Sequence, residues 1–404
     1  MESHLHDPNW SVQTANAGTG NSSWPSVAII HSFYRSSIPS GENSTARQHF
    51  SLLAKAGVDV SLISVSTDDL MSKPGYRART ASGVAFGRGM DPTEILGEIS
   101  PNIVHIHNLF PNIGTQWLQN YGGPIVATLH NYRAACASGL LSRKGKPSCM
   151  DCVTGSSLNG VKHGCYHDSR LSTIPVAFRN RKGPLNDAVI SRANKLLVPS
   201  PLMVEMYQVL GIDSVEVLFQ PTQISEVSTN HGKPAQENWV FLGRISKEKG
   251  IVELVQNWPP ERPLTILGDG PDMPQLIDAA KQVSQNIQIK GFVAESEMVT
   301  TLSQASGILV PSTWREGAPG IYADAMFLGV PVIALRGNTV YDMIQRDETG
   351  STFESLDSEL IESALLEVLS QREQYSVRCK EIYAERYSTT EWLNNLQQVY
   401  ARLI

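Results

Sequence analysis

The stretch from Gly307 to Ala334 constrains this chain most, because it contains strand, loop, helix and strand signals in immediate succession. The apolar runs Gly307–Pro311 and Pro331–Ala334 predict two short buried strands. Between them lie a loop with two glycines, Ser312–Gly320, and a predicted helix, Ile321–Leu328. This alternation predicts a parallel sheet, in which ligands bind at the carboxyl ends of the strands, over the helix N-termini.

The loop in this stretch carries groups that suit a nucleotide-sugar. The backbone of Gly317-Ala318-Pro319-Gly320 leads into a helix start, where free N–H groups and the positive dipole end favour phosphate. Two acids, Glu316 in the loop and Asp324 on the helix, can accept hydrogen bonds from hydroxyls of one ligand. The plainer alternative for these two acids is a helix cap and a solvated helix residue.

The same alternation runs through the chain in two series, separated by a polar segment. The length of 404 residues is enough for two cores. We therefore predict an α/β protein with two Rossmann-like parallel-sheet domains that face each other across a cleft. The expected parts are a disordered tail (1–24), an N-terminal domain (25–222) with a structureless insertion (134–172), a C-terminal domain (223–385) and a closing helix (386–404).

Three further strand ends in the second series have residues that suit a diphosphate or a base. Gly243 is followed by Arg244 and Lys249, which can clamp a diphosphate and stabilise the charge of a departing one. Gly268, in the turn after the next strand, allows a ligand to approach the backbone closely. The backbone of Gly291-Phe292-Val293 can meet the edge of a base. Solvated cations and plain turns are the alternatives.

The composition excludes some classes of function. The net charge is −6, which argues against a general nucleic-acid binder. No apolar run approaches the roughly 20 residues that span a bilayer. The polar N-terminus, residues 1–23, lacks the basic and apolar regions of a signal peptide. We expect a cytoplasmic protein, with peripheral attachment to a membrane as an option.

Four of the five cysteines form a cluster in the insertion, with the spacing Cys-x12-Cys-x2-Cys-x12-Cys. Four thiolates with a central Cys-x2-Cys are typical of a structural zinc site, and a metal would stabilise a segment that lacks a core. Free thiols or disulfides are the equal alternative, and His163 and His167 are alternative ligands. The candidate zinc ligands are Cys136, Cys149, Cys152 and Cys165.

The insertion and the segment after it are also rich in basic residues. They suit an anionic acceptor, such as a lipid-linked diphosphate sugar at a membrane, although scattered cations are more often a solvated face. The residues are Arg143, Lys144, Lys146, Lys162, Arg170, Arg179, Arg181 and Lys182.

His105 and His107 lie in a predicted strand, Ile103–His107. We expect the two rings on opposite faces of the sheet. A structural role is the expectation for each.

The sequence resembles the retaining glycosyltransferases of family 4 (GT4), which have the GT-B fold. FLGRISKEKG, LGDGP, KGFV and STWREGAPGIYADAMFLGVPVIA occur in the order and spacing of that family. GEN, VHIHN, VATLHNYR and the terminal RYSTTEWLNNLQQVYARL are similar too, so the resemblance covers nearly the whole chain after Trp24.

The resemblance implies a role for each matching residue. Arg244 and Lys249 match the pair that binds the donor diphosphate, and the loop 317–320 matches backbone that touches sugar or phosphate. Glu316 matches an acid near the donor sugar, and Asp324 matches the acid that holds the ribose.

In the N-terminal half, His130 matches a histidine near the donor sugar, and Gly41 matches the loop that approaches the diphosphate. Asp324 departs from the usual Glu, and Gln220-Pro221-Thr222 departs from a common Asn-Gly pair.

We therefore expect a metal-independent retaining hexosyltransferase. It would move a sugar from a UDP- or GDP-sugar to a hydroxyl of a carbohydrate or lipid-linked acceptor, in the synthesis of cell-surface polysaccharide or glycolipid. The alternatives are a non-catalytic partner that binds nucleotide-sugar and a GT-B-fold epimerase or phosphorylase. The expected catalytic residues are His130, Glu316, Arg244 and Lys249.

Overall fold

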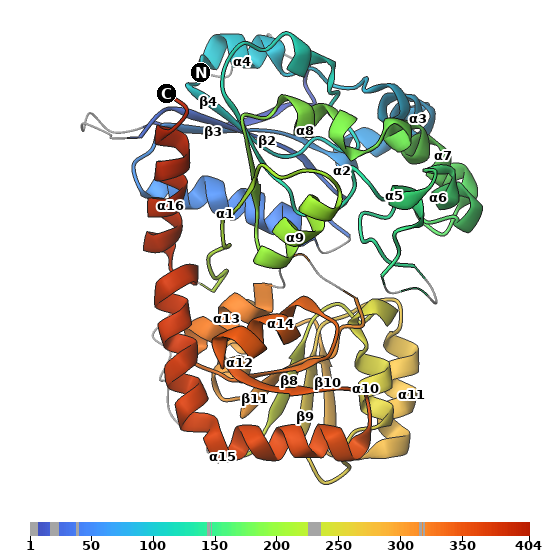
Figure 1. Ribbon diagram of the computed structural model, residues 1–404, viewed down its shortest axis with the longest axis vertical. Helices are drawn as coiled ribbons and strands as arrows, with labels where there is room; N and C mark the ends of the chain where they lie inside the picture. The colour runs from blue at the N-terminus through green and yellow to red at the C-terminus, as the bar shows by residue number, and fades with distance from the viewer. Residues whose placement is uncertain are drawn as a thin grey trace. The chain divides into compact units, whose positions relative to one another are not determined.

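A computed structural model describes residues 7–16, 24–37, 40–143, 146, 148–224, 236–314, 317 and 320–404 (Figure 1). The chain divides into two compact units. Unit 1 comprises Met1–Phe219 and Leu393–Ile404, and unit 2 comprises Gln220–Trp392. The chain therefore passes from unit 1 to unit 2 after Phe219, three residues before the predicted boundary at residue 222. It returns to unit 1 at Leu393, seven residues after the predicted start of the closing helix at residue 386.

Unit 1 contains a seven-stranded sheet in the order β1-β3-β2-β4-β5-β6-β7. All neighbouring strands are parallel except β1 and β3. The strands are β1 (Ser11–Ala15), β2 (Val27–Phe33), β3 (Val60–Ser66), β4 (Ile103–Asn108), β5 (Ile125–Thr128), β6 (Lys195–Val198) and β7 (Val215–Val217). Since β2 lies between β3 and β4, the chain reverses its direction of winding at β2 and β4. Such a switch point is where open α/β sheets bind ligands.

The strand β1 corrects the prediction of a disordered tail over residues 1–24. Ser11–Ala15 pairs antiparallel with β3, from Ser11 opposite Ser64 to Ala15 opposite Val60. The strand is mostly exposed, and its residues lack the apolar alternation of a half-buried strand. Main-chain hydrogen bonds to the open edge of β3 hold it, and these do not depend on side-chain pattern.

Nine helices of unit 1 surround this sheet in the described part of the chain. They are α1 (Gly41–Lys55), α2 (Thr67–Met71), α3 (Tyr76–Phe86), α4 (Thr93–Ile99), α5 (Asp151–Thr154), α6 (Leu158–His163), α7 (Arg170–Arg179), α8 (Ala188–Arg192) and α9 (Pro201–Val209). Local capping fixes several starts; the Ser40 hydroxyl, for example, accepts a hydrogen bond from the Asn43 N–H at the start of α1.

Three of these helices, α5, α6 and α7, correct the prediction that residues 134–172 are structureless. The first part of that segment packs into the core of unit 1, where Ala134, Ala135, Cys136 and Leu141 are buried. The prediction failed because the helices are short and the buried residues are small, so neither leaves a clear hydrophobic period.

Unit 2 contains a six-stranded parallel sheet in the order β10-β9-β8-β11-β12-β13. The strands are β8 (Trp239–Leu242), β9 (Leu264–Leu267), β10 (Ile287–Gly291), β11 (Gly307–Val310), β12 (Val332–Leu335) and β13 (Gly350–Phe353). The helices are α10 (Ile251–Gln256), α11 (Met273–Val283), α12 (Glu295–Ser303), α13 (Gly320–Leu328), α14 (Thr339–Asp347) and α15 (Ser358–Ile382). The switch point of this sheet lies between β8 and β11.

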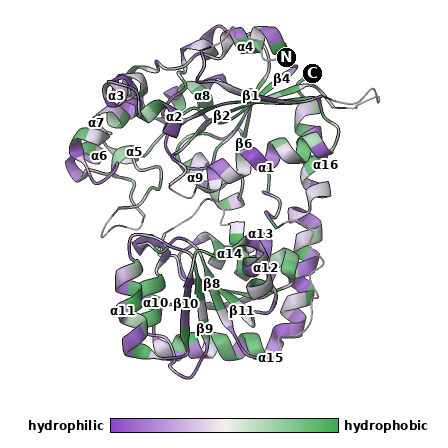
Figure 2. Ribbon diagram, turned by 180° about the vertical axis from the view of Figure 1, so that it is seen from behind, coloured by the Kyte–Doolittle hydropathy of each residue, from purple (hydrophilic) through white to green (hydrophobic). Residues whose placement is uncertain are grey.

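Both sheets have apolar interiors. The residues of β2, β5, β9, β11 and β12 are all buried, as the near-continuous hydrophobic runs of parallel strands predict. Figure 2 shows hydrophobic colouring along the strands of both sheets, while α15 combines hydrophobic and hydrophilic residues along its length. Each unit therefore has its own core.

The last helix, α16 (Thr389–Ala401), starts in unit 2 and ends in unit 1. Its residue Tyr400 is fully buried, and its hydroxyl lies 2.7 Å from Nδ1 of His105 on β4. Arg402 also forms a 2.8 Å ion pair with Glu216 of β7. This confirms the prediction of a C-terminal helix that packs on the N-terminal domain.

Candidate functional site

The predicted donor-binding loops of unit 2 follow four neighbouring strands of one sheet. They come after β10, β9, β8 and β11, which is also the order of these strands across the sheet. Because parallel strands end at the same edge, the sheet brings the loops together. The two loops with the charged candidates, after β8 and β11, flank the switch point.

Main-chain hydrogen bonds join these loops to one another. The Gly243 N–H donates to the Leu267 carbonyl (3.1 Å), and the Gly268 N–H donates to the Gly291 carbonyl (2.8 Å). The Thr313 N–H donates to the Glu248 carbonyl (2.9 Å), which links the loop after β8 to the loop after β11. The edge is therefore a continuous main-chain surface rather than four independent turns.

Gly268 shows why this edge needs glycine. Its φ is +126°, and a Cβ built on it would lie 1.9 Å from the carbonyl oxygen of Gly243. Gly250 is a second case, with φ +68° and a Cβ position 2.2 Å from the Pro311 carbonyl oxygen. The group that approaches Gly268 closely is a neighbouring loop of the same chain, and the predicted approach of a ligand stays a prediction.

The two candidate cations lie on the loop after β8. Arg244 is exposed, and Lys249 is half-buried immediately before Gly250. Gly291, with φ +69°, ends β10, and the next residue, Phe292, is 84% exposed, the highest value among the large hydrophobic residues described. Val293, next along the chain, is half-buried. Two cations and a bare aromatic ring at one sheet edge suit a phosphate and a flat base.

The loop after β11, Ser312–Gly320, is only partly described. Glu316, Ala318 and Pro319 lie outside the described residues, so their predicted contacts stay predictions. Gly317 and Gly320 are described, and Gly320 begins α13.

Asp324, on the buried side of α13, has partners within unit 2. Its Oδ1 accepts hydrogen bonds from the Thr222 hydroxyl (2.7 Å) and the Gln223 N–H (3.1 Å). Burial raises the pKa of Asp324 to about 6, although these hydrogen bonds lower it. Asp324 therefore holds the segment that enters unit 2, a role that sequence reasoning missed. Nothing in the spacing from Thr222 to Asp324 signals that contact.

In unit 1, His130 follows β5 and belongs to a hydrogen-bonded row of histidines. Its Nε2 lies 3.1 Å from Nδ1 of His107, and Nε2 of His107 lies 3.2 Å from Nδ1 of His49. Burial, and then the neighbouring histidines, hold the pKa of His107 well below its usual range. Burial also lowers the pKa of His130, against the opposing charge of Glu42. Each neutral ring can donate at one nitrogen and accept at the other, so the rings of this row can form a continuous chain of hydrogen bonds.

Two features of this row were not predicted. His49 is a buried residue of α1, and no local pattern marks it. His105 and His107 do not point to opposite faces, because their ring centroids are 4.7 Å apart. The reason is that residues two apart in a strand point to the same face of the sheet, so the prediction of opposite faces was wrong.

Gly41 is the first residue of α1, next to the carboxyl end of β2. A Cβ built on it meets nothing within 4 Å, so no atom of the described protein crowds the position. This placement agrees with the predicted loop but does not test the predicted contact with a diphosphate.

A cavity of about 400 Å³ opens in unit 1 at the carboxyl ends of β4 and β5. His107 and His130 line it. So does Arg133, whose Nε and Nη1 atoms are buried and have no hydrogen-bond partner by geometry among the described residues. The charged residues of the lining are five cations and one acid: Arg88, Arg133, Arg179, Arg181, Lys182 and Asp187. Such a lining suits an anionic or strongly polar ligand.

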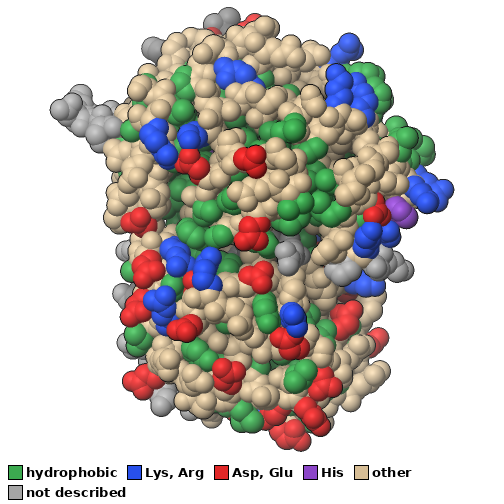
Figure 3. Space-filling view, in the orientation of Figure 1, with side chains coloured by type: hydrophobic (Ala, Val, Ile, Leu, Met, Phe, Trp, Pro, Cys, Tyr) green, Lys and Arg blue, Asp and Glu red, His purple; other side chains and the backbone are tan. Residues whose placement is uncertain are grey.

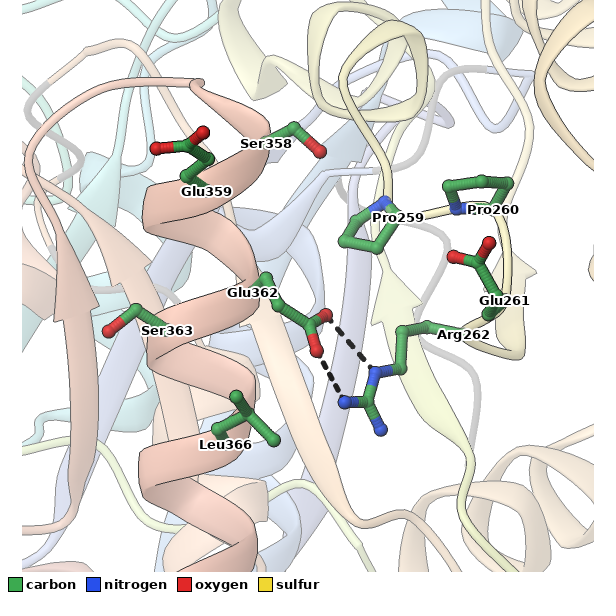
Figure 4. Close-up of a pocket in the computed structure, with 9 residues that line it drawn as sticks. All are labelled: Pro259, Pro260, Glu261, Arg262, Ser358, Glu359, Glu362, Ser363 and Leu366. Atoms are coloured by element: carbon green, nitrogen blue, oxygen red, sulfur yellow. Dashed lines mark hydrogen bonds and ion pairs between the residues drawn. The ribbon is translucent and has the colours of Figure 1, made fainter.

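A second cavity, in unit 2, lies between the segment Pro259–Arg262 and the first turns of α15 (Figure 4). Arg262 bonds Glu362 across it and also forms a 2.9 Å ion pair with Glu237. Because Arg262 precedes β9, this cavity lies at the amino ends of the strands, away from the candidate donor loops. Its Arg262 is already paired with two acids, and we assign this cavity a structural role.

The four clustered cysteines are free thiols in this structure. Burial first, and then the neighbouring Cys136, raises the pKa of Cys152 to about 11, so these sulfurs lie close enough to interact. Among the described residues, however, no three His, Cys, Asp or Glu side chains are grouped so that they can hold a metal ion. The thiols as placed do not fit a zinc site, and the zinc interpretation stays a prediction.

Among the described residues, no helix is both long enough and apolar enough to cross a membrane.

Comparisons with known proteins agree with this geometry. Residues 236–371 match the model of the family "Glycosyl transferases group 1". The sulfoquinovosyl transferase SQD2 of Arabidopsis thaliana is 27% identical over 150 residues, which cover 35% of this chain and 28% of that protein. N-acetyl-alpha-D-glucosaminyl L-malate synthase of Bacillus anthracis is 18% identical over 225 residues, covering 54% of this chain and 58% of that protein. The matches thus span about a quarter and somewhat over half of these relatives.

Solved structures match over a longer stretch. Sucrose-phosphate synthase from Thermosynechococcus elongatus has a TM-score of 0.63 at 15% identity and covers 94% of this chain and 99% of its own. Anabaena HepE in complex with UDP-glucose has a TM-score of 0.58 at 13% identity, covering 94% and 100%. At these identities the likeness shows the fold.

Proposed function

Because residues 236–371 are a glycosyl transferases group 1 domain in a chain with the GT-B fold, we propose that this protein is a retaining glycosyltransferase of the GT4 type. It moves a sugar from a UDP- or GDP-sugar to a hydroxyl of a carbohydrate or lipid-linked acceptor, in cytoplasmic synthesis of surface polysaccharide or glycolipid. The observation that carries the proposal is the meeting of the β8 and β11 loops at the switch point of the unit 2 sheet.

The donor's diphosphate is proposed to bind at this switch point. Arg244 is exposed on the β8 loop and supplies a planar fork, and Lys249 supplies a point charge. As the bond to the sugar breaks, negative charge grows on the diphosphate, and these cations lower the energy of that state without a metal ion. Glu316 is proposed to hold the donor sugar.

The base is proposed to bind at the end of β10. The exposed ring of Phe292 offers a flat apolar surface, and the main chain of Gly291 and Val293 offers hydrogen-bonding groups. HepE, a structural neighbour, has been solved with UDP and UDP-glucose, which supports a nucleotide-sugar as the donor class.

Unit 1 is proposed to supply the acceptor pocket and His130. The 400 Å³ cavity with His130 in its wall lies at the carboxyl ends of β4 and β5, where this class of sheet binds ligands. A neutral imidazole can accept or donate a hydrogen bond at a sugar hydroxyl, and its contact with His107 makes the proton positions of the two rings depend on each other.

The first test is a calorimetric titration with UDP, GDP and their sugars. We expect one of the two nucleotides to bind, and Arg244→Ala to weaken that binding at least about tenfold, as for the loss of a charge-assisted hydrogen bond. The matched control is Lys247→Ala, an exposed cation of the same loop. If neither nucleotide binds, or if the two variants behave alike, the donor site is assigned wrongly.

The second test separates an enzyme from a non-catalytic nucleotide-sugar-binding partner. One observation favours the partner: Asp324, which the family uses for the ribose, already accepts two hydrogen bonds from Thr222 and Gln223. A retaining enzyme should hydrolyse its donor slowly in the absence of acceptor. The released sugar should have the anomeric configuration, α or β, that it has in the donor, and NMR determines that configuration. Donor binding without any turnover would favour the partner.

A further inference from the structure

The helix α7 has apolar residues on both of its faces. Thr173, Val176 and Ala177 are buried against unit 1. On the opposite side, Leu171, Ile174 and Phe178 follow one another at intervals of three and four residues, and so share one stripe of the helix.

The outer stripe of α7 is open to solvent. Leu171 is 79% exposed, Ile174 49% and Phe178 37%. The ring of Phe86, at the end of α3, lies 5.2 Å from that of Phe178 and is 57% exposed. We call Phe86, Leu171, Ile174 and Phe178 the α7 patch. A contiguous group of exposed large apolar side chains on a soluble domain marks a surface that another body covers.

The charge around the α7 patch is the reverse of the charge of the whole chain. The chain carries a net −6, yet residues 75–90 and 158–186, which contain α3, α6 and α7, hold eight Lys and Arg and one acid, Asp168. Seven of the cations are exposed, and the eighth, Arg179, pairs with Asp187. The exposed ones are Arg77, Arg79, Arg88, Lys162, Arg170, Arg181 and Lys182.

The cations and the apolar residues are intermixed rather than separate. The guanidinium carbon of Arg181 lies 3.7 Å from the centre of the Phe178 ring, and that of Arg88 lies 5.9 Å from the Phe86 ring. Figure 3 shows hydrophobic side chains beside Lys and Arg side chains where Figure 1 draws α3 and α7. Side chains of this kind enter the headgroup region of a bilayer together, because the apolar parts insert while the cations meet lipid phosphates.

We propose that the α7 patch and the cations around it bind the surface of a bilayer that contains anionic lipids. A second copy of the chain fits less well, because a two-fold contact would place two strongly basic surfaces against each other. The α7 patch shares Phe86 with the cavity of unit 1, and the surrounding cations Arg88, Arg181 and Lys182 line that cavity too. The cavity therefore opens beside the proposed membrane face. If the proposed function holds, an acceptor anchored in that bilayer reaches the cavity without leaving the bilayer.

The test is co-sedimentation of the full chain with vesicles of phosphatidylcholine alone or mixed with phosphatidylglycerol. We expect binding to the mixed vesicles only, weakened by high salt, since the screening length shortens. Leu171→Ser with Ile174→Ser should lower the partition coefficient at least about tenfold, through lost insertion of two aliphatic side chains. Lys162→Glu with Arg170→Glu should lower it at least about twentyfold, at about fivefold for each basic residue.

Matched controls come from exposed residues of unit 2. Leu366→Ser with Val377→Ser on α15, and Lys281→Glu on α11, change similar side chains and should leave vesicle binding unchanged. Circular dichroism and thermal unfolding identify any variant that fails to fold.

The proposal is overturned if the wild type does not bind mixed vesicles, or if the controls lose binding to the same extent. It is also overturned if the α7 variants change self-association, measured by sedimentation, while vesicle binding stays the same. The assay uses neither donor nor acceptor, so its failure is separate from a failure of the calorimetric titration.

Discussion

Asp324 should make the folded protein less stable as the pH rises through about 6. Its carboxylate is 7% exposed, and burial raises its pKa from 3.8 to about 6, despite the hydrogen bonds from Thr222 and Gln223. The folded chain therefore holds this proton more tightly than the unfolded chain does. The sign follows: the contribution of Asp324 favours folding below its unfolded pKa and is lost as the pH rises through its folded pKa.

The size of the effect comes from the shift. A difference of 2.2 units, from 3.8 to about 6, corresponds to about 3 kcal/mol between strongly acidic and alkaline solution. Only part of this free-energy change falls in a pH range that suits unfolding measurements. Between about pH 5 and about pH 8, the unfolded side chain is already ionised while the folded one loses its proton, and the change is about 1.4 kcal/mol.

The substitution that isolates this effect is Asp324→Asn, which keeps the acceptor oxygen for Thr222 and Gln223 and removes the titration. Urea unfolding followed by tryptophan fluorescence, at several pH values, gives the free energy of unfolding of variant and wild type. The variant should gain about 1.4 kcal/mol relative to the wild type from about pH 5 to about pH 8. Asp278→Asn, an exposed position on α11, should give a flat difference. A flat or inverted profile for Asp324→Asn would refute the reasoning.

Three other predictions concern the main chain, the histidine row and the cysteines. Gly268→Ala should lower the free energy of unfolding by at least about 3 kcal/mol, because of its clash with Gly243, whereas Gly97→Ala, whose Cβ meets nothing within 4 Å, should not. His107→Gln should lower turnover about tenfold, the equivalent of one buried hydrogen bond, and leave nucleotide affinity in calorimetry unchanged. The zinc interpretation predicts about one zinc per chain in elemental analysis of fresh protein, lost in Cys149→Ser; metal-free wild-type protein ends it.

The fold of this chain was largely predictable because parallel strands leave continuous apolar runs. The runs Gly307–Pro311 and Pro331–Ala334 were both found as buried strands, β11 and β12. Ser11–Ala15 escaped prediction because an edge strand can be held by main-chain bonds alone, without an apolar pattern. The short helices of the insertion escaped because their buried residues are small.

The candidate site was predictable where a chemical role requires a residue type at a strand end. Gly268 and the neighbourhood of the β8 and β11 loops follow from turn chemistry and strand order. The row from His49 through His107 to His130 did not, because it joins residues far apart in sequence. Contacts of this kind, like that of Asp324 with Thr222, are set by tertiary packing and leave no local trace.

The burial of Tyr400 in unit 1 has a consequence for biosynthesis. Unit 2 is one unbroken segment, Gln220–Trp392, and can fold as soon as that segment has left the ribosome. Most of unit 1 precedes unit 2 in the chain, yet the hydroxyl that bonds His105 in its core belongs to Tyr400, which follows the whole of unit 2. Unit 1 is therefore completed only after unit 2 has been synthesised, and until then its binding surface for α16 stays uncovered.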